Sequence, residues 1–461
     1  MSFFHAYDIR GTTADGLNAA FAERLGRAAF DVYHPKRVLV GRDMRSSSPE
    51  LEQALIKGLT DHGVDVVRIG LCSTPLFNVA MGMAGGKCDL GIMVTASHNP
   101  GQYNGFKFAD GSVYPIGLGS GLEKIEQRFL SEEAFTPSVS KGSVSDDDSN
   151  LARYLDLITS FVSPSDIAAM KIAIDAGNGM AGFVLPSLME RLPQVDAVPM
   201  YWDMDGTFPN HEANPIKTET LSALSHTVRE QGCMIGVAYD GDCDRIGFVD
   251  EEGSPIPGDL MEVVLARVLL RQHPGALILR DLRSSWVVEE EILAAGGKTE
   301  MTRVGHSFIK RQLRESGALF AGELSMHYYH QSLWGVESGD LTLLLLLKEL
   351  SDSGKKLSEL WRPLQKYAYS GEVNSQVSDT AKALESVRAA YASSASSIVE
   401  IDGIRMEFGV GADGSKNEHS WWFSVRASNT EPLVRLIVEA VDPKVMEVKR
   451  DELLKVIKAV A

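Results

Sequence analysis

The chain has 461 residues, which is more than one hydrophobic core usually organises, so its length predicts several domains. Hydrophobic residues make up 44% and charged residues 23%, which is typical of a folded α/β protein and excludes a disordered or fibrous one. A formal net charge of −17 opposes binding to nucleic acid or to an anionic membrane, so neither is expected as a partner. An anionic ligand would therefore need a local pocket of positive charge.

Three further features bear on location. The amino terminus lacks the basic segment and long apolar run of a signal peptide, which favours a cytoplasmic protein. The longest apolar run, residues 341–347, is far shorter than the ~20 residues of a membrane span, so we expect a buried helix there. The four cysteines form no CxxC pair and are expected to be reduced and packed: Cys72, Cys88, Cys233 and Cys243.

The first part of the chain alternates strand and helix patterns. Strands are predicted at residues 37–41, 64–69 and 88–95, and a helix at residues 50–62. Residues 131–150 are rich in serine and acidic residues and show no periodicity, so we expect the first domain boundary there.

The same strand pattern restarts twice, at residues 171–175 and 276–279. After about residue 370 the pattern changes to strands at 421–426 and 433–438 and a helix at 445–460, typical of a smaller α+β unit. The predicted domains are residues 1–150, 151–256, 257–369 and 370–461.

The first chemical cluster is TASHNP at residues 95–100, followed by YNGFK at 103–107. A strand delivers Ser97 into a loop, because the proline disfavours helix at the residue before it. A serine held at a strand end is exposed to a reactant, and the nearby Lys107 can serve as proton acceptor or phosphate partner. The serine lies outside a GxSxG elbow, which argues against an acyl-transfer hydrolase.

The second cluster is DGDCDR at residues 240–245, between two strand-like segments. Alternate residues of an extended loop point the same way, so Asp240, Asp242 and Asp244 are predicted to converge on one Mg²⁺ ion. A calcium EF-hand is the competing interpretation, but Arg245 occupies the position that requires glycine.

Two further clusters suit a phosphorylated sugar. GELSMH at residues 322–327 offers a carboxylate, a hydroxyl and an imidazole for sugar hydroxyls. RASNTEP at residues 426–432, with Arg435 close behind, offers a guanidinium and many small donors for a phosphate dianion.

In this order the four clusters resemble the loops of the α-D-phosphohexomutase superfamily, in its phosphomannomutase and phosphoglucomutase branch. Further matches are AYDIRG at 6–11, GRD at 41–43, DAGNG at 175–179 and VGHS at 304–307. The resemblance spans nearly the whole chain. It implies three similar mixed-sheet α/β domains and a smaller C-terminal α+β domain around a central cleft.

The resemblance also implies roles, residue by residue. Ser97 would carry the phosphoryl group and, with the three aspartates, ligate magnesium, while Lys107, Arg245 and His306 would be catalytic. Substrate binding is implied for these residues: Tyr7, Arg10, His98, Arg283, Gly305, Glu323, Ser325, His327, Arg426, Ser428, Asn429, Thr430 and Arg435. The match of Arg283 to a lysine or arginine of the family is a looser one.

The reaction implied is exchange between a hexose 6-phosphate and a hexose 1-phosphate through a hexose 1,6-bisphosphate, which is both intermediate and activator. Arg245 and Mg²⁺ would stabilise the transferred group, and a neighbouring base such as Lys107 would take the hydroxyl proton. The fourth domain would act as a mobile lid.

Leu324 resembles the methionine of mannose-specific and dual-specificity members, which favours mannose 6-phosphate. A glucose-preferring or dual-specificity enzyme, a phosphoglucosamine mutase, a phosphatase of the phosphoserine type and a non-catalytic sugar-phosphate sensor are the alternatives. Monomer and dimer both stay open.

Overall fold

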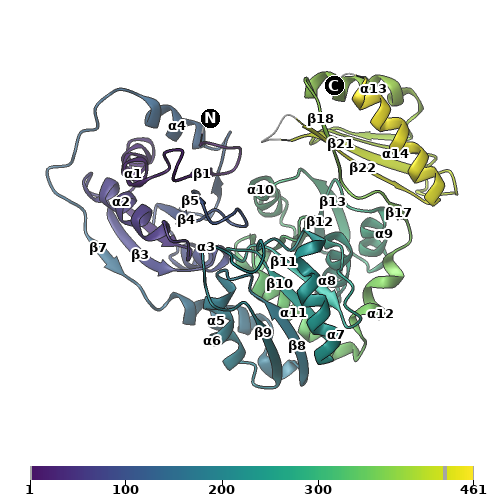
Figure 1. Ribbon diagram of the computed structural model, residues 1–461, viewed down its shortest axis with the longest axis horizontal. Coiled ribbons are helices and arrows are strands. Elements are labelled where there is room, and N and C mark those ends of the chain that lie inside the picture. Colours follow the sequence, from purple (N-terminus) through teal and green to yellow (C-terminus); the bar gives the residue numbers. More distant parts are fainter. Residues whose placement is uncertain (1–2, 429–432, 460–461) are drawn as a thin grey trace.

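The computed structural model describes residues 3–428 and 433–459 (Figure 1). Its strands form four separate sheets that follow one another along the chain. The first three sheets mix parallel and antiparallel pairs, and the fourth is antiparallel throughout the described residues. The predicted fold class, three mixed-sheet α/β domains and a C-terminal α+β domain, is confirmed.

The first sheet has the strand order β1-β5-β4-β2-β3-β7, with β6 beside β5. Its central strands are covered on both faces: α1 and α2 pack on one face and α3 on the other. All five residues of β4 are buried, as expected for a strand enclosed by helices on both sides. The elements are β1 (Ile9–Thr12), α1 (Ala19–Tyr33), β2 (Arg37–Arg42), α2 (Ser48–Thr60), β3 (Asp65–Leu71), α3 (Thr74–Met83), β4 (Leu90–Val94), β5 (Tyr103–Asp110), β6 (Pro115–Ile116), α4 (Leu122–Leu130) and β7 (Val144–Asp146).

Strand β7 lies in the segment where the sequence predicted only an irregular linker. Its three residues are exposed and pair with β3 through the backbone, so no apolar pattern marks them. The first sheet therefore extends further along the chain than its hydrophobic pattern does. The predicted domain boundaries remain a proposal.

The second and third sheets repeat the plan with fewer strands. They follow the orders β11-β10-β8-β9 and β13-β12-β14-β15-β16. The second unit contains α5 (Asn150–Phe161), β8 (Met170–Asp175), α6 (Ala181–Glu190), β9 (Val195–Met200), α7 (Ser222–Gln231), β10 (Ile235–Tyr239) and β11 (Ile246–Asp250). The third contains α8 (Gly258–Gln272), β12 (Leu277–Asp281), α9 (Trp286–Ala294), β13 (Lys298–Thr302), α10 (His306–Ser316), β14 (Phe320–Gly322), β15 (Tyr328–His330), β16 (Val336–Glu337), α11 (Gly339–Ser353) and α12 (Leu357–Trp361).

The predicted buried helix over residues 341–347 is confirmed as the middle of α11. Its seven residues are at most 5% exposed, and the six leucines among them lie in one core that joins the first three units. Among the described residues, no helix combines the length and the apolar composition that a membrane crossing requires. All four cysteines are free and buried, as expected for packing residues.

The fourth unit is a sheet with two helices. It contains β17 (Ala368–Tyr369), β18 (Val373–Gln376), α13 (Thr380–Tyr391), β19 (Ser397–Val399), β20 (Ile404–Phe408), β21 (Trp421–Ala427), β22 (Leu433–Ala440) and α14 (Pro443–Lys458). In Figure 1 it stands apart from the first unit and beside α9 and β13 of the third.

A buried arginine joins the fourth unit to the third. Arg405 of β20 is 1% exposed and donates to the carbonyl oxygens of Leu282 at 2.7 Å and Ser284 at 2.9 Å. Its guanidinium also lies 3.7 Å from the centre of the Trp422 ring. Because these two carbonyls flank Arg283, the fourth unit holds the segment that presents this arginine.

A buried carboxyl group lies at the same junction. Glu439 of β22 accepts hydrogen bonds from the backbone N–H of Trp286 at 3.0 Å and from the indole of Trp422 at 2.7 Å. Burial raises its pKa to about 7. The junction therefore contains a group that titrates near neutral pH.

Candidate functional site

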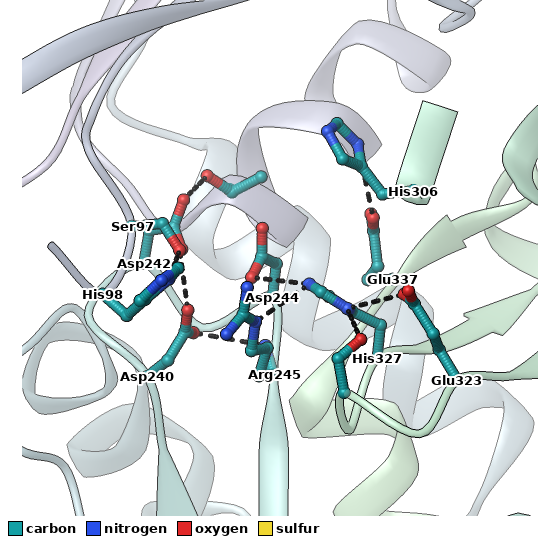
Figure 2. Close-up of polar contacts among 12 residues, drawn as sticks. Ser97, His98, Asp240, Asp242, Asp244, Arg245, His306, Glu323, His327 and Glu337 are labelled. Atoms are coloured by element: carbon teal, nitrogen blue, oxygen red, sulfur yellow. Dashed lines mark hydrogen bonds and ion pairs between the residues drawn. The ribbon is translucent and has the colours of Figure 1, made fainter. Parts of the chain in front are cut away.

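Ser97 lies three residues beyond the end of β4, in a loop against the second unit (Figure 2). Its hydroxyl donates to Oδ2 of Asp240 at 2.8 Å and lies 3.1 Å from Nδ1 of His98. Its backbone is left-handed, with φ of 51°, a conformation that costs a non-glycine residue about 1–3 kcal/mol. The fold therefore holds this serine in a strained conformation that aims its hydroxyl at the acidic loop.

The three aspartates lie on the turn between β10 and β11. One carboxylate oxygen of each lies within 4.8 Å of those of the others, so the expected convergence is present. The expectation of an extended loop was wrong, however. The chain turns tightly, with the N–H of Cys243 3.2 Å from the carbonyl of Asp240 and φ of 68° at Cys243.

The acidic site is neutralised by Lys107 from the first unit. Its ammonium donates to Asp242 at 2.7 Å and to Asp244 at 2.6 Å. Burial alone would lower the pKa of Lys107, but these two carboxylates outweigh it and raise the pKa. The ammonium form therefore prevails, which argues against the proton-accepting role that the sequence suggested for this lysine.

The aspartates differ in their surroundings. Burial, together with the charges of Asp244 and Asp242, raises the pKa of Asp240. Burial would also raise the pKa of Asp244, but Lys107 and His327 outweigh it and lower the pKa. The same loop thus contains one carboxyl group, Asp240, whose protonated form is favoured and another, Asp244, whose ionised form is favoured.

The donor set fits a magnesium ion. Asp242 is fully buried, and its Oδ1 has no hydrogen-bond partner within the described ranges 3–428 and 433–459. Buried polar oxygens normally have a partner, and three carboxylates beside a hydroxyl are the hard oxygen ligands that Mg²⁺ prefers. Asp240, Asp242, Asp244 and the Ser97 hydroxyl could therefore hold this ion.

The predicted sugar loop follows β14, and His327 connects it to the acidic loop (Figure 2). Its Nδ1 lies 2.9 Å from Oε2 of Glu323 and 3.0 Å from the hydroxyl of Ser325, and its Nε2 lies 3.3 Å from Oδ1 of Asp244. Burial alone would lower the pKa of His327, but Asp244 raises it to about 9. Arg245 reaches the same imidazole, with Nε 3.2 Å from Nε2.

Arg283 extends this contact chain toward the fourth unit. It lies just beyond β12 and is only 6% exposed. Its Nη2 lies 3.2 Å from Oε1 of Glu323, and its Nη1 lies 3.8 Å from Oε2 of Glu372. Arg283, the residue that matches the family less closely, therefore contacts the predicted sugar loop directly.

The predicted phosphate-binding arginines lie opposite each other on β21 and β22. Arg426 pairs with Arg435 in the strand register, and both contact Glu372, at 3.9 Å and 2.8 Å respectively. The backbone N–H of Ser428 donates to the carbonyl of Leu433. The predicted ligands Asn429 and Thr430 lie outside the described residues.

The remaining predicted residues lie at the junction of the first and third units. The Tyr7 ring meets the His306 ring edge-on at 5.5 Å. Gly305 has φ of 119°, and a Cβ there would lie 2.6 Å from the Tyr7 hydroxyl, so the close approach requires glycine. Arg10 donates to the Asn99 side chain at 2.7 Å, beside the Ser97 loop.

Burial, with a contribution from Lys310, lowers the pKa of His306 well below its usual value. The imidazole is therefore neutral at physiological pH. Its Nδ1 lies 3.9 Å from Oε1 of Glu337, which connects the start of α10 to β16 (Figure 2).

Sequence reasoning missed three residues of this network. Thr74, at the start of α3, donates to Asp242 at 2.7 Å, and Glu372 lies among the three arginines. Arg45 lies two residues after Asp43, the last residue of the GRD motif, and donates to the carbonyl oxygen of Ser97 at 2.7 Å. None of the three lies in a motif that carries reactive chemistry, although the nearby GRD match gave a signal for Arg45.

Comparison with known proteins agrees with this architecture. The chain matches the phosphoglucomutase/phosphomannomutase alpha/beta/alpha domains I, II and III at residues 1–135, 152–253 and 257–367, and the C-terminal domain at 372–456. It is 37% identical to a phosphomannomutase of Salmonella montevideo, covering 99% of both chains. It is 36% identical to a phosphomannomutase of Methanocaldococcus jannaschii, covering 98% of this chain and 97% of that one.

A solved structure agrees with the fold as well. A phosphoglucomutase/phosphomannomutase family protein of Burkholderia thailandensis superposes with a TM-score of 0.86 at 32% identity, covering 99% of this chain and 97% of that one. Fold, site and relatives together define a mutase, an enzyme of the isomerase class. The chain belongs to the phosphoglucomutase/phosphomannomutase family, and thus to the superfamily that its motifs resemble.

Proposed function

We propose that this enzyme interconverts mannose 6-phosphate and mannose 1-phosphate, with Ser97 as its phosphoryl carrier. The observation that carries the proposal is the Ser97 hydroxyl, which lies 2.8 Å from Asp240 in the acidic site. Several relatives of similar length that are about 36% identical are named phosphomannomutases, which supports the choice of sugar.

The reaction has two transfers with the same carrier. The bond between the Ser97 oxygen and phosphorus breaks while the oxygen of the free sugar hydroxyl bonds to that phosphorus. The hydroxyl proton ends on the released Ser97 oxygen, and a hexose 1,6-bisphosphate results. After the bisphosphate turns over, its other phosphoryl group returns to Ser97. Mg²⁺, when bound by the aspartates, would offset the negative charge of the transferred group.

Other side chains stabilise the transferred group and bind the substrate. Arg245 provides positive charge beside the transferred oxygens, and Glu323 and Ser325 bind sugar hydroxyls. Arg426 and Arg435 bind the phosphate that does not react, and the fourth domain acts as a lid. Lys107 and His306 act with Arg245 at the reacting centre. The remaining substrate contacts are made by His98, His327, Arg283, Tyr7, Arg10, Gly305, Ser428, Asn429 and Thr430.

The sugar preference depends on Leu324, which resembles the methionine of mannose-specific and dual-specificity members. A dual-specificity or glucose-preferring enzyme is the alternative within the family. A cytoplasmic location and a monomeric or dimeric state complete the proposal.

A side-by-side assay tests the proposal. The enzyme receives Mg²⁺, catalytic hexose 1,6-bisphosphate and mannose, glucose or glucosamine phosphate, while isomerisation and phosphate release are measured separately. We expect fastest turnover of mannose phosphate without phosphate release, one phosphoryl group on Ser97 by intact mass, and loss of turnover by about 10⁴-fold or more in Ser97→Ala.

Other outcomes would select an alternative. Steady release of inorganic phosphate would indicate a phosphatase, and binding without turnover would indicate a sensor. Near-wild-type activity of Ser97→Ala would disprove the carrier assignment.

A further inference from the structure

Arg45 lies beneath the Ser97 loop and is completely buried, at 0% exposure. Its Nη2 donates to the carbonyl oxygens of Ser97 at 2.7 Å and Asn99 at 2.6 Å. Its Nη1 donates to those of Pro100 and Tyr103, both at 2.9 Å. One guanidinium therefore holds four carbonyl groups of a loop that spans only seven residues.

Asp43 fixes this guanidinium in turn. Its Oδ2 accepts from Nε of Arg45 at 3.1 Å, so all five N–H donors of the guanidinium are used. Its Oδ1 accepts from the hydroxyl of Ser48 at 2.6 Å, which orients the carboxylate. Such a planar, fully satisfied fork has one geometry, which an ammonium group cannot reproduce.

The second unit presses on the same loop from the other side. A Cβ on Gly241, between the first two aspartates, would lie 2.4 Å from the carbonyl oxygen of Ser97. A Cβ on Gly206 would lie 2.6 Å from Cα of Arg45, and the Phe208 ring centre lies 5.1 Å from its guanidinium. The Ser97 carbonyl is thus held between Arg45 and the acidic loop.

We propose that Arg45 is a positioning residue that sets the direction of the Ser97 side chain, and thereby the alignment of its phosphoryl group with the sugar hydroxyl. The strained φ of Ser97 requires such support, because a relaxed loop would turn the hydroxyl away from Asp240. The inference rests on the proposed carrier role of Ser97. Arg45 itself contacts none of the residues assigned to the sugar or to the distant phosphate, among those that the structure describes.

The role predicts a split between rate and binding. A misplacement of about 1 Å at the reacting group costs about a hundredfold in rate. We therefore expect Arg45→Lys to lower kcat, and the single-turnover rate of Ser97 phosphorylation by a hexose 1,6-bisphosphate, by about a hundredfold each. The KM for hexose phosphate should stay within about threefold, because the predicted sugar loop and the arginines of the fourth unit are untouched.

Arg24→Lys is the matched control. Arg24 lies in the same unit and also donates to two backbone carbonyls, those of Phe129 and Ser131, both at 2.6 Å, but far along the chain from Ser97. It should leave both rates within about twofold of wild type. A folded Arg45→Lys that phosphorylates Ser97 within about threefold of the wild-type rate would overturn the inference, as would a rise in KM at constant kcat.

Asp43→Asn decides the matter if Arg45→Lys does not fold, which circular dichroism would reveal. This substitution keeps the shape of the side chain and one acceptor oxygen but weakens its hold on the Arg45 guanidinium. We therefore expect Ser97 to be phosphorylated about tenfold more slowly. An unchanged rate would overturn the inference. The wild-type protein is measured first. If wild-type Ser97 takes up no phosphoryl group, the proposed function itself is wrong. This result differs from a failure of the Arg45 inference, in which the wild-type protein is phosphorylated and the variants are phosphorylated equally fast.

Discussion

The two ends of the site are built differently. At the Ser97 end, the aspartates, Lys107 and Thr74 form a dense, buried network with distances near 2.7 Å. At the fourth-unit end, three arginines lie within 4 Å of the Glu372 carboxylate, and of these Arg435 approaches it most closely, at 2.8 Å. The comparison indicates that the end proposed to react is organised before substrate binds, whereas the end proposed to bind phosphate has positive charge available for a ligand.

Replacing Arg426 should give the largest effect on the phosphate-binding end. Arg426→Lys keeps the charge but loses the bidentate fork, so we expect KM for hexose phosphate to rise by about tenfold, equivalent to about 1.4 kcal/mol of binding. Steady-state kinetics would measure it, with Arg388→Lys, whose arginine pairs with Glu400 on the surface of the same unit, as control. An unchanged KM would mean that this arginine does not bind the phosphate.

Neutralising Glu372 sharpens the comparison further. Glu372→Gln removes a negative charge that competes with phosphate for Arg435, Arg426 and Arg283, so KM should fall by about threefold. Glu385→Gln, on the exposed face of α13, is the control. A higher KM would instead show that Glu372 orients the arginines for the substrate.

Glu439 should make the stability of the fourth-unit junction sensitive to pH, without a direct effect on the binding of hexose phosphate. Because burial raises its pKa to about 7, the folded protein binds the proton more tightly than the unfolded chain does. Its contribution to stability is therefore present at low pH and lost as pH rises from the ordinary glutamate value to about 7, by about 3 kcal/mol at most. Above pH 7 its contribution is constant.

Calorimetry of Glu439→Gln at pH 5 and pH 8 would test this. The free energy of unfolding of Glu439→Gln, relative to that of the wild type, should be higher at pH 8 than at pH 5. The exposed Glu447→Gln should show no such difference between the two pH values. Equal differences at both pH values would contradict the raised pKa.

The sequence predicted those parts of the site whose residues are close neighbours in the chain. Ser97 and the three aspartates lie in short motifs between apolar strands, so both the chemistry and the placement can be read locally. The contact of Thr74 with Asp242 spans 168 residues, and nothing in the local pattern of a helix start reveals a partner in another unit. Similarly, β7 is exposed and is held by backbone pairing with β3 and by the ion pair of Arg68 with Asp146, so hydrophobic periodicity does not reveal it.

The aspartate loop shows how a correct expectation can rest on the wrong geometry. Alternation along an extended chain predicted convergence of the carboxylates, but a tight turn with Cys243 in the left-handed region produces it. Lys107 was recognised as a partner of the site, yet its protonation depends on Asp242 and Asp244, which belong to a different unit. Charge states set by contacts between units could not be predicted from the motifs.

The hydrogen bonds of Arg405 join the fourth unit to the segment of the third unit that carries Arg283. Its hydrogen bonds to the carbonyls of Leu282 and Ser284 lie on either side of Arg283, which contacts Glu323. A rotation of the fourth unit must therefore either carry this segment with it or break both bonds. The loop proposed to bind the sugar is thus mechanically coupled to the unit proposed to bind the phosphate at the far end of the same ligand.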